Sequence, residues 1–260
     1  MAPVGRYPIQ SAMQELGVSP AADPIAVSPD EFMARIGRLP LMHQPGEGWM
    51  YHTGMDILAV FIARLTGSPL GDFLQERLFA PLGMGDTGFS VPSRSFHRLV
   101  AAYTIGEGGR LQEWEPAGGG SYAQPPIFPS ELVSTADDYL AFARMLLENG
   151  FGPSGRVLSA ASVRLMMTDH ITPEQKAVSP FFPGFWDRQG WGYGGAVTTI
   201  AGGSASPGSY GWMGGLGTSV LIDPTVRMTT ILMTQRLMRG PEDTVVHTDV
   251  QSSAYAALNA

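Results

Sequence analysis

Tyr51 is the side chain whose setting is best suited to chemistry, because it is expected in a loop directly ahead of a helix. A turn rich in Pro and Gly over residues 44–48 precedes it, and a helix is predicted to begin at Thr53 or Gly54. A phenol with its ordinary pKa of about 10 accepts a proton poorly at neutral pH unless a cation lies nearby. Tyr51 is therefore either a proton-transfer group beside a cation or a buried loop tyrosine that donates to a carbonyl.

Two predicted helices hold this loop in place. The first ends at Gly67, and the second is expected to have Ser68 as its cap, to begin at Pro69 and to end at Pro81. Apolar residues at a 3.6-residue period predict a buried face on each helix. These faces are Ile57, Leu58, Phe61, Ile62 and Leu65 on the first helix, and Leu70, Phe73, Leu74, Leu78 and Phe79 on the second.

A second informative region, residues 190–235, is rich in glycine beside strand-like runs. Glycine is expected where a backbone approaches a ligand closely, although a tight bend explains it equally well. Residues 218–222 and 227–234 predict a hairpin of two strands, and residues 242–258 predict a terminal helix. Two further serines, Ser134 and Ser159, stand where helix N-caps are expected, so they are interpreted as caps and not as nucleophiles.

The segment Tyr51-His52-Thr53-Gly54-Met55-Asp56, followed by Phe79-Ala80-Pro81-Leu82-Gly83-Met84, resembles the serine β-lactamase-like hydrolases, which share the class C β-lactamase and penicillin-binding-protein-like fold. Within them it is most similar to the family VIII carboxylesterases, whose segment reads Tyr-Ser-x-x-x-Asp. The resemblance implies that Tyr51 is part of the catalytic base and that Asp56 is an orienting carboxylate. His52 replaces the usual Ser, and Thr53 replaces the Asn of true β-lactamases, which favours esters as substrates.

The same resemblance extends to the glycine-rich region. Trp212-Met213-Gly214 matches the Trp-x-Gly of these esterases, so Trp212, Gly214 and Gly215 are expected to bind substrate, with the Gly215 N–H donating to an oxyanion. The implied fold is α+β, with three α-β-α layers and an antiparallel sheet. The resemblance also implies one domain over residues 1–260. Residues 28–130 are expected to be mostly helix and loop, and residues 131–260 to contain helices, the C-terminal strands and a last helix.

No complete nucleophile can be found in the chain. Acyl transfer needs a nucleophile, a proton acceptor and N–H donors at the developing oxyanion. The family uses the serine of Ser-x-x-Lys, but the only lysine is Lys176 and the residue three positions before it is Pro173. No Gly-x-Ser-x-Gly elbow occurs either. A fragment that lacks the first strands and the nucleophile helix is the simplest interpretation.

Composition excludes several other classes of function. The formal net charge of -7 disfavours nucleic acid as a partner. The chain has no cysteine, and its five histidines lack metal-ligand spacing, so neither a metal nor a cofactor is expected. There is no apolar run of 18 residues and no signal-peptide pattern, which predicts a soluble protein without a membrane span, cytoplasmic in preference to exported.

Two function hypotheses remain open. One is a serine hydrolase, a carboxylesterase acting on short acyl esters or related β-lactam-like substrates, present here without its nucleophile. The other is a noncatalytic protein that binds a small molecule or a partner in an apolar cleft between Tyr51 and Trp212. A truncated layer would leave a sheet edge and an apolar patch uncovered, so a homo-oligomer or a missing N-terminal segment is expected to cover them.

Overall fold

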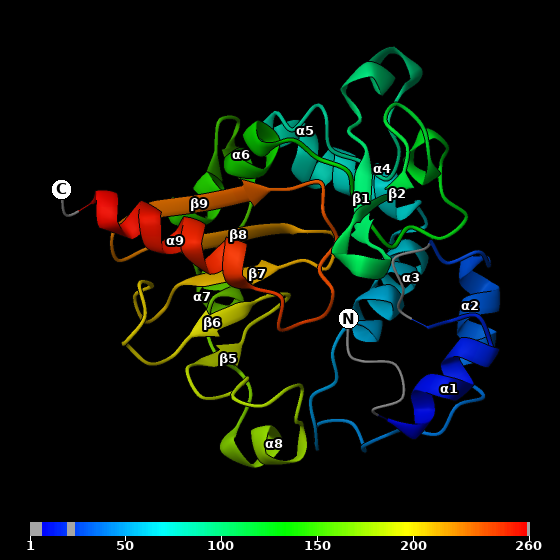
Figure 1. Ribbon diagram of the computed structural model, residues 1–260, viewed down its shortest axis with the longest axis horizontal. Coiled ribbons are helices and arrows are strands. Elements are labelled where there is room, and N and C mark those ends of the chain that lie inside the picture. Colours follow the sequence, from blue (N-terminus) through cyan, green and yellow to red (C-terminus); the bar gives the residue numbers. More distant parts are fainter. Residues whose placement is uncertain (1–6, 20–23, 259–260) are drawn as a thin grey trace.

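The computed structural model describes residues 7–19 and 24–258, in which a five-stranded antiparallel sheet lies beside a helical region. The strand order is β5-β6-β7-β8-β9 (Figure 1). The strands are β5 (Gln189–Trp191), β6 (Ala196–Thr198), β7 (Tyr210–Met213), β8 (Thr218–Asp223) and β9 (Met228–Met233). Every neighbouring pair is antiparallel, as short connections between successive strands require.

Helices cover both faces of the sheet. Figure 1 shows α9 (Val245–Ala257) crossing one face, with α6 (Ala136–Leu147) and α7 (Ala160–Met166) behind the other. The core between the sheet and the latter two helices is formed by buried side chains that include Leu146, Val163, Val197, Tyr210 and Ile222. The expected hairpin at 218–222 and 227–234 is confirmed as β8 and β9, and the terminal helix begins three residues later than predicted.

The helical region contains the described residues up to Leu82. Its elements are α1 (Pro8–Glu15), α2 (Pro29–Ile36), α3 (Thr53–Thr66), α4 (Leu70–Leu74), a π-helical turn (Gln75–Phe79) and α5 (Ala80–Leu82). A separate core joins α1, α2 and α3 to Phe128, whose ring centre lies 4.7 Å from that of Phe32. This core anchors α3, the helix that follows Tyr51.

The remaining elements are short. They are 3₁₀ turns at Ser93–Arg98, Glu107–Gly109 and Ser121–Ala123, the hairpin β1 (Ala102–Ile105) and β2 (Leu111–Glu115), the small hairpin β3 (Phe151–Gly152) and β4 (Gly155–Arg156), and α8 (Pro173–Val178). Among the described residues, no single helix has the length and apolar character to cross a bilayer. Only α3 together with Leu70–Leu82, bent by 81°, meets that test on length and composition.

The prediction that the apolar face of α3 is buried is wrong. Phe61 is 56% exposed and Leu65 is 72% exposed, and Ile57 and Leu58 are exposed as well. The buried side chains of α3 are Asp56, Ala59 and Val60, because that side of the helix packs on the core formed with α2. Periodicity identified an apolar stripe, but within residues 7–19 and 24–258 no element covers it.

Three details of the helix ends also differ from expectation. Pro69, not Ser68, is the residue before α4, and the helical path continues past Pro81 to Leu82 before Gly83 adopts a φ of 74°. Pro81 lies near the end of a helical path that is continuous from Leu70, directly after the π-helical turn Gln75–Phe79, and this path ends one residue later. Thr135, not Ser134, caps α6 by accepting the Asp138 N–H at 3.2 Å, while Ser159 caps α7 as predicted.

Candidate active site

Tyr51 and Trp212 are brought into direct contact. The indole Nε1–H of Trp212, on β7, donates to the Tyr51 hydroxyl oxygen at 2.8 Å, and their ring centres lie 5.5 Å apart. Burial raises the pKa of Tyr51, and the hydrogen bond from Trp212 opposes that rise only in part. Tyr51 is therefore a neutral phenol at neutral pH in this arrangement, and it needs a nearby positive charge to accept a proton in catalysis.

An aromatic cluster surrounds this pair. The rings that contact Tyr51, Trp212 or each other belong to Trp49, Phe181, Phe182, Phe185, Trp186 and Trp191. Trp49 is central, with its ring 5.0 Å from that of Trp191 and 5.1 Å from that of Trp186. A cleft was expected between Tyr51 and Trp212; the two side chains are in direct contact, and neither lines the cavity described below.

Lys176 does not supply the missing cation to Tyr51. Its ammonium group forms an ion pair with Asp169 at 2.6 Å and lies 5.7 Å from the centre of the Trp186 ring. The carboxylate of Asp169 also accepts the N–H groups of Ile171 and Trp191. Because Trp191 belongs to the aromatic cluster, the ion pair between Lys176 and Asp169 helps to hold that cluster in place. The sequence's only lysine is structural here.

His52, next to Tyr51, forms a γ-turn that enters α3. Its φ of 82° and ψ of -73° are those of a classic γ-turn, and the Thr53 N–H donates to the Tyr51 carbonyl at 3.3 Å. The His52 Nδ1 lies 3.3 Å from the Asp56 carboxylate, which is 4% exposed. Asp56 thus approaches His52, and any orienting effect on Tyr51 passes through this strained turn.

Glu131 and Tyr122 complete the surroundings of α3's first turn, and sequence reasoning missed both. The Tyr122 hydroxyl donates to the Glu131 carboxylate at 3.0 Å. Burial raises the pKa of Glu131, while the bond from Tyr122 and the nearby His52 lower it. Both residues lie in a loop rich in Gly and Pro, and no motif there signals chemistry.

The glycine turn between β7 and β8 presents one candidate oxyanion donor. The Gly214 N–H donates to the Thr218 carbonyl at 2.8 Å, so it is occupied within the hairpin. No hydrogen bond is formed by the Gly215 N–H within the described part of the chain, whereas the Gly215 carbonyl accepts from the Met238 N–H at 2.9 Å. Of the two glycines that were expected to bind substrate, Gly215 alone has an N–H free for a ligand.

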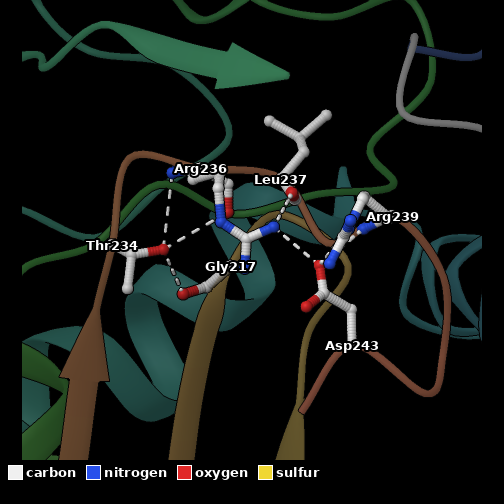
Figure 2. Close-up of polar contacts among 6 residues, drawn as sticks. All are labelled: Gly217, Thr234, Arg236, Leu237, Arg239 and Asp243. Atoms are coloured by element: carbon white, nitrogen blue, oxygen red, sulfur yellow. Dashed lines mark hydrogen bonds and ion pairs between the residues drawn. The ribbon is translucent and has the colours of Figure 1, made fainter. Parts of the chain in front are cut away.

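Figure 2 shows how the segment after β9 fixes this turn. The Thr234 hydroxyl donates to the Gly217 carbonyl at 2.7 Å, and Arg236 donates to the Leu237 carbonyl at 3.2 Å and to Asp243 at 2.6 Å. The bond from Arg236 lowers the pKa of Asp243 to about 2. Nothing in the sequence pattern marks these three side chains, because their roles depend on a contact between distant loops.

Gly217 is required where it stands. Its φ is +90°, and a Cβ at this position would lie 2.1 Å from the Arg236 carbonyl oxygen and 2.4 Å from the Thr234 hydroxyl. Residues with a Cβ are disfavoured by both the backbone conformation and the close approach. The segment Thr234–Asp243 therefore packs directly on the turn that carries Gly215.

A cavity of about 720 Å³ lies beside this turn, away from the Tyr51–Trp212 pair. It is bounded mainly by apolar side chains of residues 78–135, α6 and the end of β9, among them Phe79, Met84, Tyr139, Phe142, Leu216 and Met233. The cavity reaches Leu216 and Thr218 but not Tyr51 or Trp212. This cavity therefore does not bring the predicted site residues together in one pocket.

Three serine hydroxyls outside the Tyr51–Trp212 pair have other partners. Ser134 lies 2.8 Å from the Thr87 hydroxyl, Ser209 is fully buried and donates to the Ser206 carbonyl at 2.6 Å, and Ser204 donates to Ser252 at 3.1 Å. Among the residues that the structure describes, no group of three His, Asp or Glu side chains could hold a metal ion. The arrangement offers a proton-transfer candidate and an N–H donor, with no activated serine beside them.

The chain is similar to several known proteins over part of their length. The chain is 37% identical over 237 residues to Protein Rv1367c of Mycobacterium tuberculosis, covering 88% of this chain and 57% of that protein. It is 32% identical to a lovastatin esterase of Penicillium rubens, over 71% of this chain and 49% of the esterase. Esterase EstB of Burkholderia gladioli is 26% identical over 88% of this chain and 60% of its own length. The chain thus spans about half to three fifths of these relatives.

Solved structures show the same fold. EstCE1, described as a hydrolase with promiscuous acyltransferase activity, superposes with a TM-score of 0.74 at 21% identity, over 94% of this chain and 66% of its own. Unliganded simvastatin synthase of Aspergillus terreus, as a selenomethionyl derivative, gives a TM-score of 0.72 at 19% identity, over 99% and 66%. The family model described as Beta-lactamase matches residues 10–254, and the chain therefore belongs to the β-lactamase family.

Proposed function

We propose that these 260 residues form the proton-transfer and oxyanion portion of a serine hydrolase that cleaves short acyl esters through an acyl-enzyme. The observation that carries the proposal is the hydrogen bond that Trp212 on β7 donates to Tyr51, because β7 runs directly into the turn with the free Gly215 N–H. The esterases among the relatives support an ester as substrate. No cofactor has a role in this chemistry.

The proposed mechanism assigns each group one task. A serine hydroxyl attacks the ester carbonyl, Tyr51 takes the hydroxyl proton and returns it to the leaving alcohol, and the Gly215 N–H donates to the oxyanion. Tyr51 can act as a base only when a cation lowers its pKa, and Lys176 is engaged with Asp169. Both the serine and the cation are therefore assigned to a Ser-x-x-Lys segment outside these 260 residues.

Ester hydrolysis tests the proposal directly. The 260-residue chain alone is expected to give no burst of p-nitrophenol from p-nitrophenyl butyrate, because the serine that lies beside a basic group, Ser219 at 3.0 Å from the His247 Nδ1, is buried together with that histidine. The same chain joined behind a family segment that carries Ser-x-x-Lys is expected to give the burst. A joined protein that folds but shows neither a burst nor a covalent adduct with a fluorophosphonate would refute the assignment.

A noncatalytic binding protein is the second candidate, and the cavity of about 720 Å³ favours it. Its volume lies within the range of about 300–1,000 Å³ typical of small-molecule sites. Trp114 lines this cavity, so its fluorescence would report a bound ligand. Saturable quenching by an apolar ester in the wild-type chain, lost in Trp114→Phe, together with no turnover in the joined protein, would favour binding over catalysis.

A further inference from the structure

A buried imidazole joins α9 to the sheet. His247, in the first turn of α9, is 1% exposed, and its Nδ1 forms a hydrogen bond of 3.0 Å with the Ser219 hydroxyl on β8. Ser219 is itself 8% exposed. Neither residue lines the cavity described above, so a molecule held in that cavity does not reach this serine. The pair is therefore a contact between two elements and not a second nucleophile.

Both ends of α9 are attached to β8 by polar side chains. At the far end of the helix, the Tyr255 hydroxyl donates to the Asp223 carboxylate. Asp223 is the last residue of β8, whereas Ser219 is its second residue. Figure 1 shows α9 lying across this face of the sheet. The bond between His247 and Ser219 is therefore the attachment at the end where β8 leaves the glycine turn.

Ser219 lies at the base of the turn that carries Gly215. It is paired with Met213, the last residue of β7, in the ladder between β7 and β8. The Gly214 N–H donates to the carbonyl of Thr218, the residue before Ser219, at 2.8 Å. A movement of Ser219 would therefore displace the turn directly.

The segment Thr234–Asp243 packs on the other side of the same turn, as Figure 2 shows, and it leads into α9. Its Met238 N–H donates to the Gly215 carbonyl at 2.9 Å. The segment ends two residues before α9 begins. The start of α9 thus anchors the turn on both sides, through the chain to this segment and through His247 to Ser219.

His247 is neutral at neutral pH. Burial lowers the pKa of His247, the positive charge of Arg236 lowers it further, and the Asp243 carboxylate opposes both effects. No charged residue lies on β9, and the charged residue of β8, Asp223, is bonded to Tyr255 at the other end of α9. The attachment is therefore complete above the ordinary histidine pKa of about 6.5. It weakens as the pH falls below that value, because protonation places a charge in a buried position.

We propose that His247 is a positioning residue of the hydrolase, whose bond to Ser219 holds the Gly215 N–H in the orientation in which it donates to the oxyanion. The catalytic consequence rests on the proposed function, whereas the structural part can be tested in the 260-residue chain. An oxyanion donor acts at a definite distance from the oxygen, so a small displacement of the turn removes much of its effect. His247 itself acts only through the turn.

NMR of the wild-type chain tests the structural part. The Gly215 amide shift is expected to follow one titration step between about pH 8 and about pH 4, with a midpoint below about 6.5. His247→Asn should remove this step, because its amide can bond the Ser219 hydroxyl in the place of Nδ1 but does not titrate. His97→Asn, at an exposed histidine, should keep the step. Absence of the step in the wild type, or its persistence in His247→Asn, would overturn the proposal.

Hydrolysis of p-nitrophenyl butyrate by the joined protein tests the catalytic part. His247→Leu should lower kcat about 10-fold or more with little change in KM, because the oxyanion develops only in the transition state. His247→Asn should recover most of that loss and should lack the fall in kcat that His247 causes at acid pH. Equal kcat in His247→Leu and the wild type would overturn the positioning role. A joined protein without turnover would refute the proposed function, and the NMR step would still decide whether His247 holds the turn.

Discussion

Trp212 on β7 donates its indole N–H to the hydroxyl of Tyr51, 161 positions earlier in the chain, at a distance of 2.8 Å. This bond ties the loop ahead of α3 to the sheet. Because Trp212 has a single N–H donor, the bond also fixes which way the phenol of Tyr51 is oriented. The contact accounts for the position of the proposed base without any help from Asp56.

Replacing Trp212 should change the titration of Tyr51. In Trp212→Phe the donor is lost while burial remains, so the pKa of Tyr51 is expected to rise further above its ordinary value. Loss of one neutral hydrogen bond should also cost about 1 kcal/mol of stability. NMR of ring-labelled tyrosine checks the first effect, with Trp191→Phe as the aromatic control. An unchanged or lowered Tyr51 pKa would contradict the role given to this bond.

Gly217 and Gly215 form a matched pair for testing the turn. Gly217→Ala places a Cβ at a φ of +90° and 2.1 Å from the Arg236 carbonyl, so the strained backbone alone should cost about 1–3 kcal/mol. Gly215→Ala meets no atom within 4 Å and should be close to neutral. Urea unfolding measures both, and equal stabilities of the two variants would show that the turn is not held by Thr234–Asp243.

Asp243 should make stability depend on pH in the acid range. Its pKa falls from an ordinary 3.8 to about 2 through the bond from Arg236, so its contribution is complete above about pH 4 and is lost as the pH falls through 2. Asp243→Asn should therefore lower stability by about 2 kcal/mol at pH 7, at 1.36 kcal/mol for each pKa unit. The two proteins should converge near pH 2 in urea unfolding. A constant difference from pH 7 to pH 2 would rule out this ion pair as the cause.

Mutations on the two sides of α3 should differ in how much they lower the stability of the protein. Val60, which is 4% exposed, packs in the core with Phe32, and Val60→Ala should cost about 1–2 kcal/mol. Leu65→Ser, at a position 72% exposed, should change stability by less than about 0.5 kcal/mol. Thermal unfolding at low protein concentration compares them. A larger loss in Leu65→Ser would mean that its face is buried in the protein as it exists in solution.

Local features of the fold were predictable because local residues determine them. The start of α3 after Tyr51, its end at Gly67 and the cap at Ser159 follow from side chains within a few positions. The cap of α6 was misplaced by one residue, because Ser134 and Thr135 are both suited to capping. The Ser134 hydroxyl is engaged instead with Thr87, a residue 47 positions away.

Long-range features needed either the family resemblance or the structure. The resemblance indicated Tyr51, Trp212 and Gly215 as candidate site residues, but it could not show that the Gly214 N–H donates to the Thr218 carbonyl. The period of α3 revealed an apolar stripe, yet a period does not say which neighbour will cover it. Arg236 and Asp243 carry no local signal, because they matter only through the turn on which they pack.

The role of Tyr51 in proton transfer is tested most directly by the kinetics of Tyr51→Phe in the protein that also carries the Ser-x-x-Lys segment. Removing a proton acceptor that acts in the transition state should lower kcat by about 100-fold or more, with KM changed only a few-fold. A Tyr51→Phe enzyme that keeps its kcat would contradict the account. So would hydrolysis by the 260-residue chain alone with an acyl group on Ser204 or Ser209.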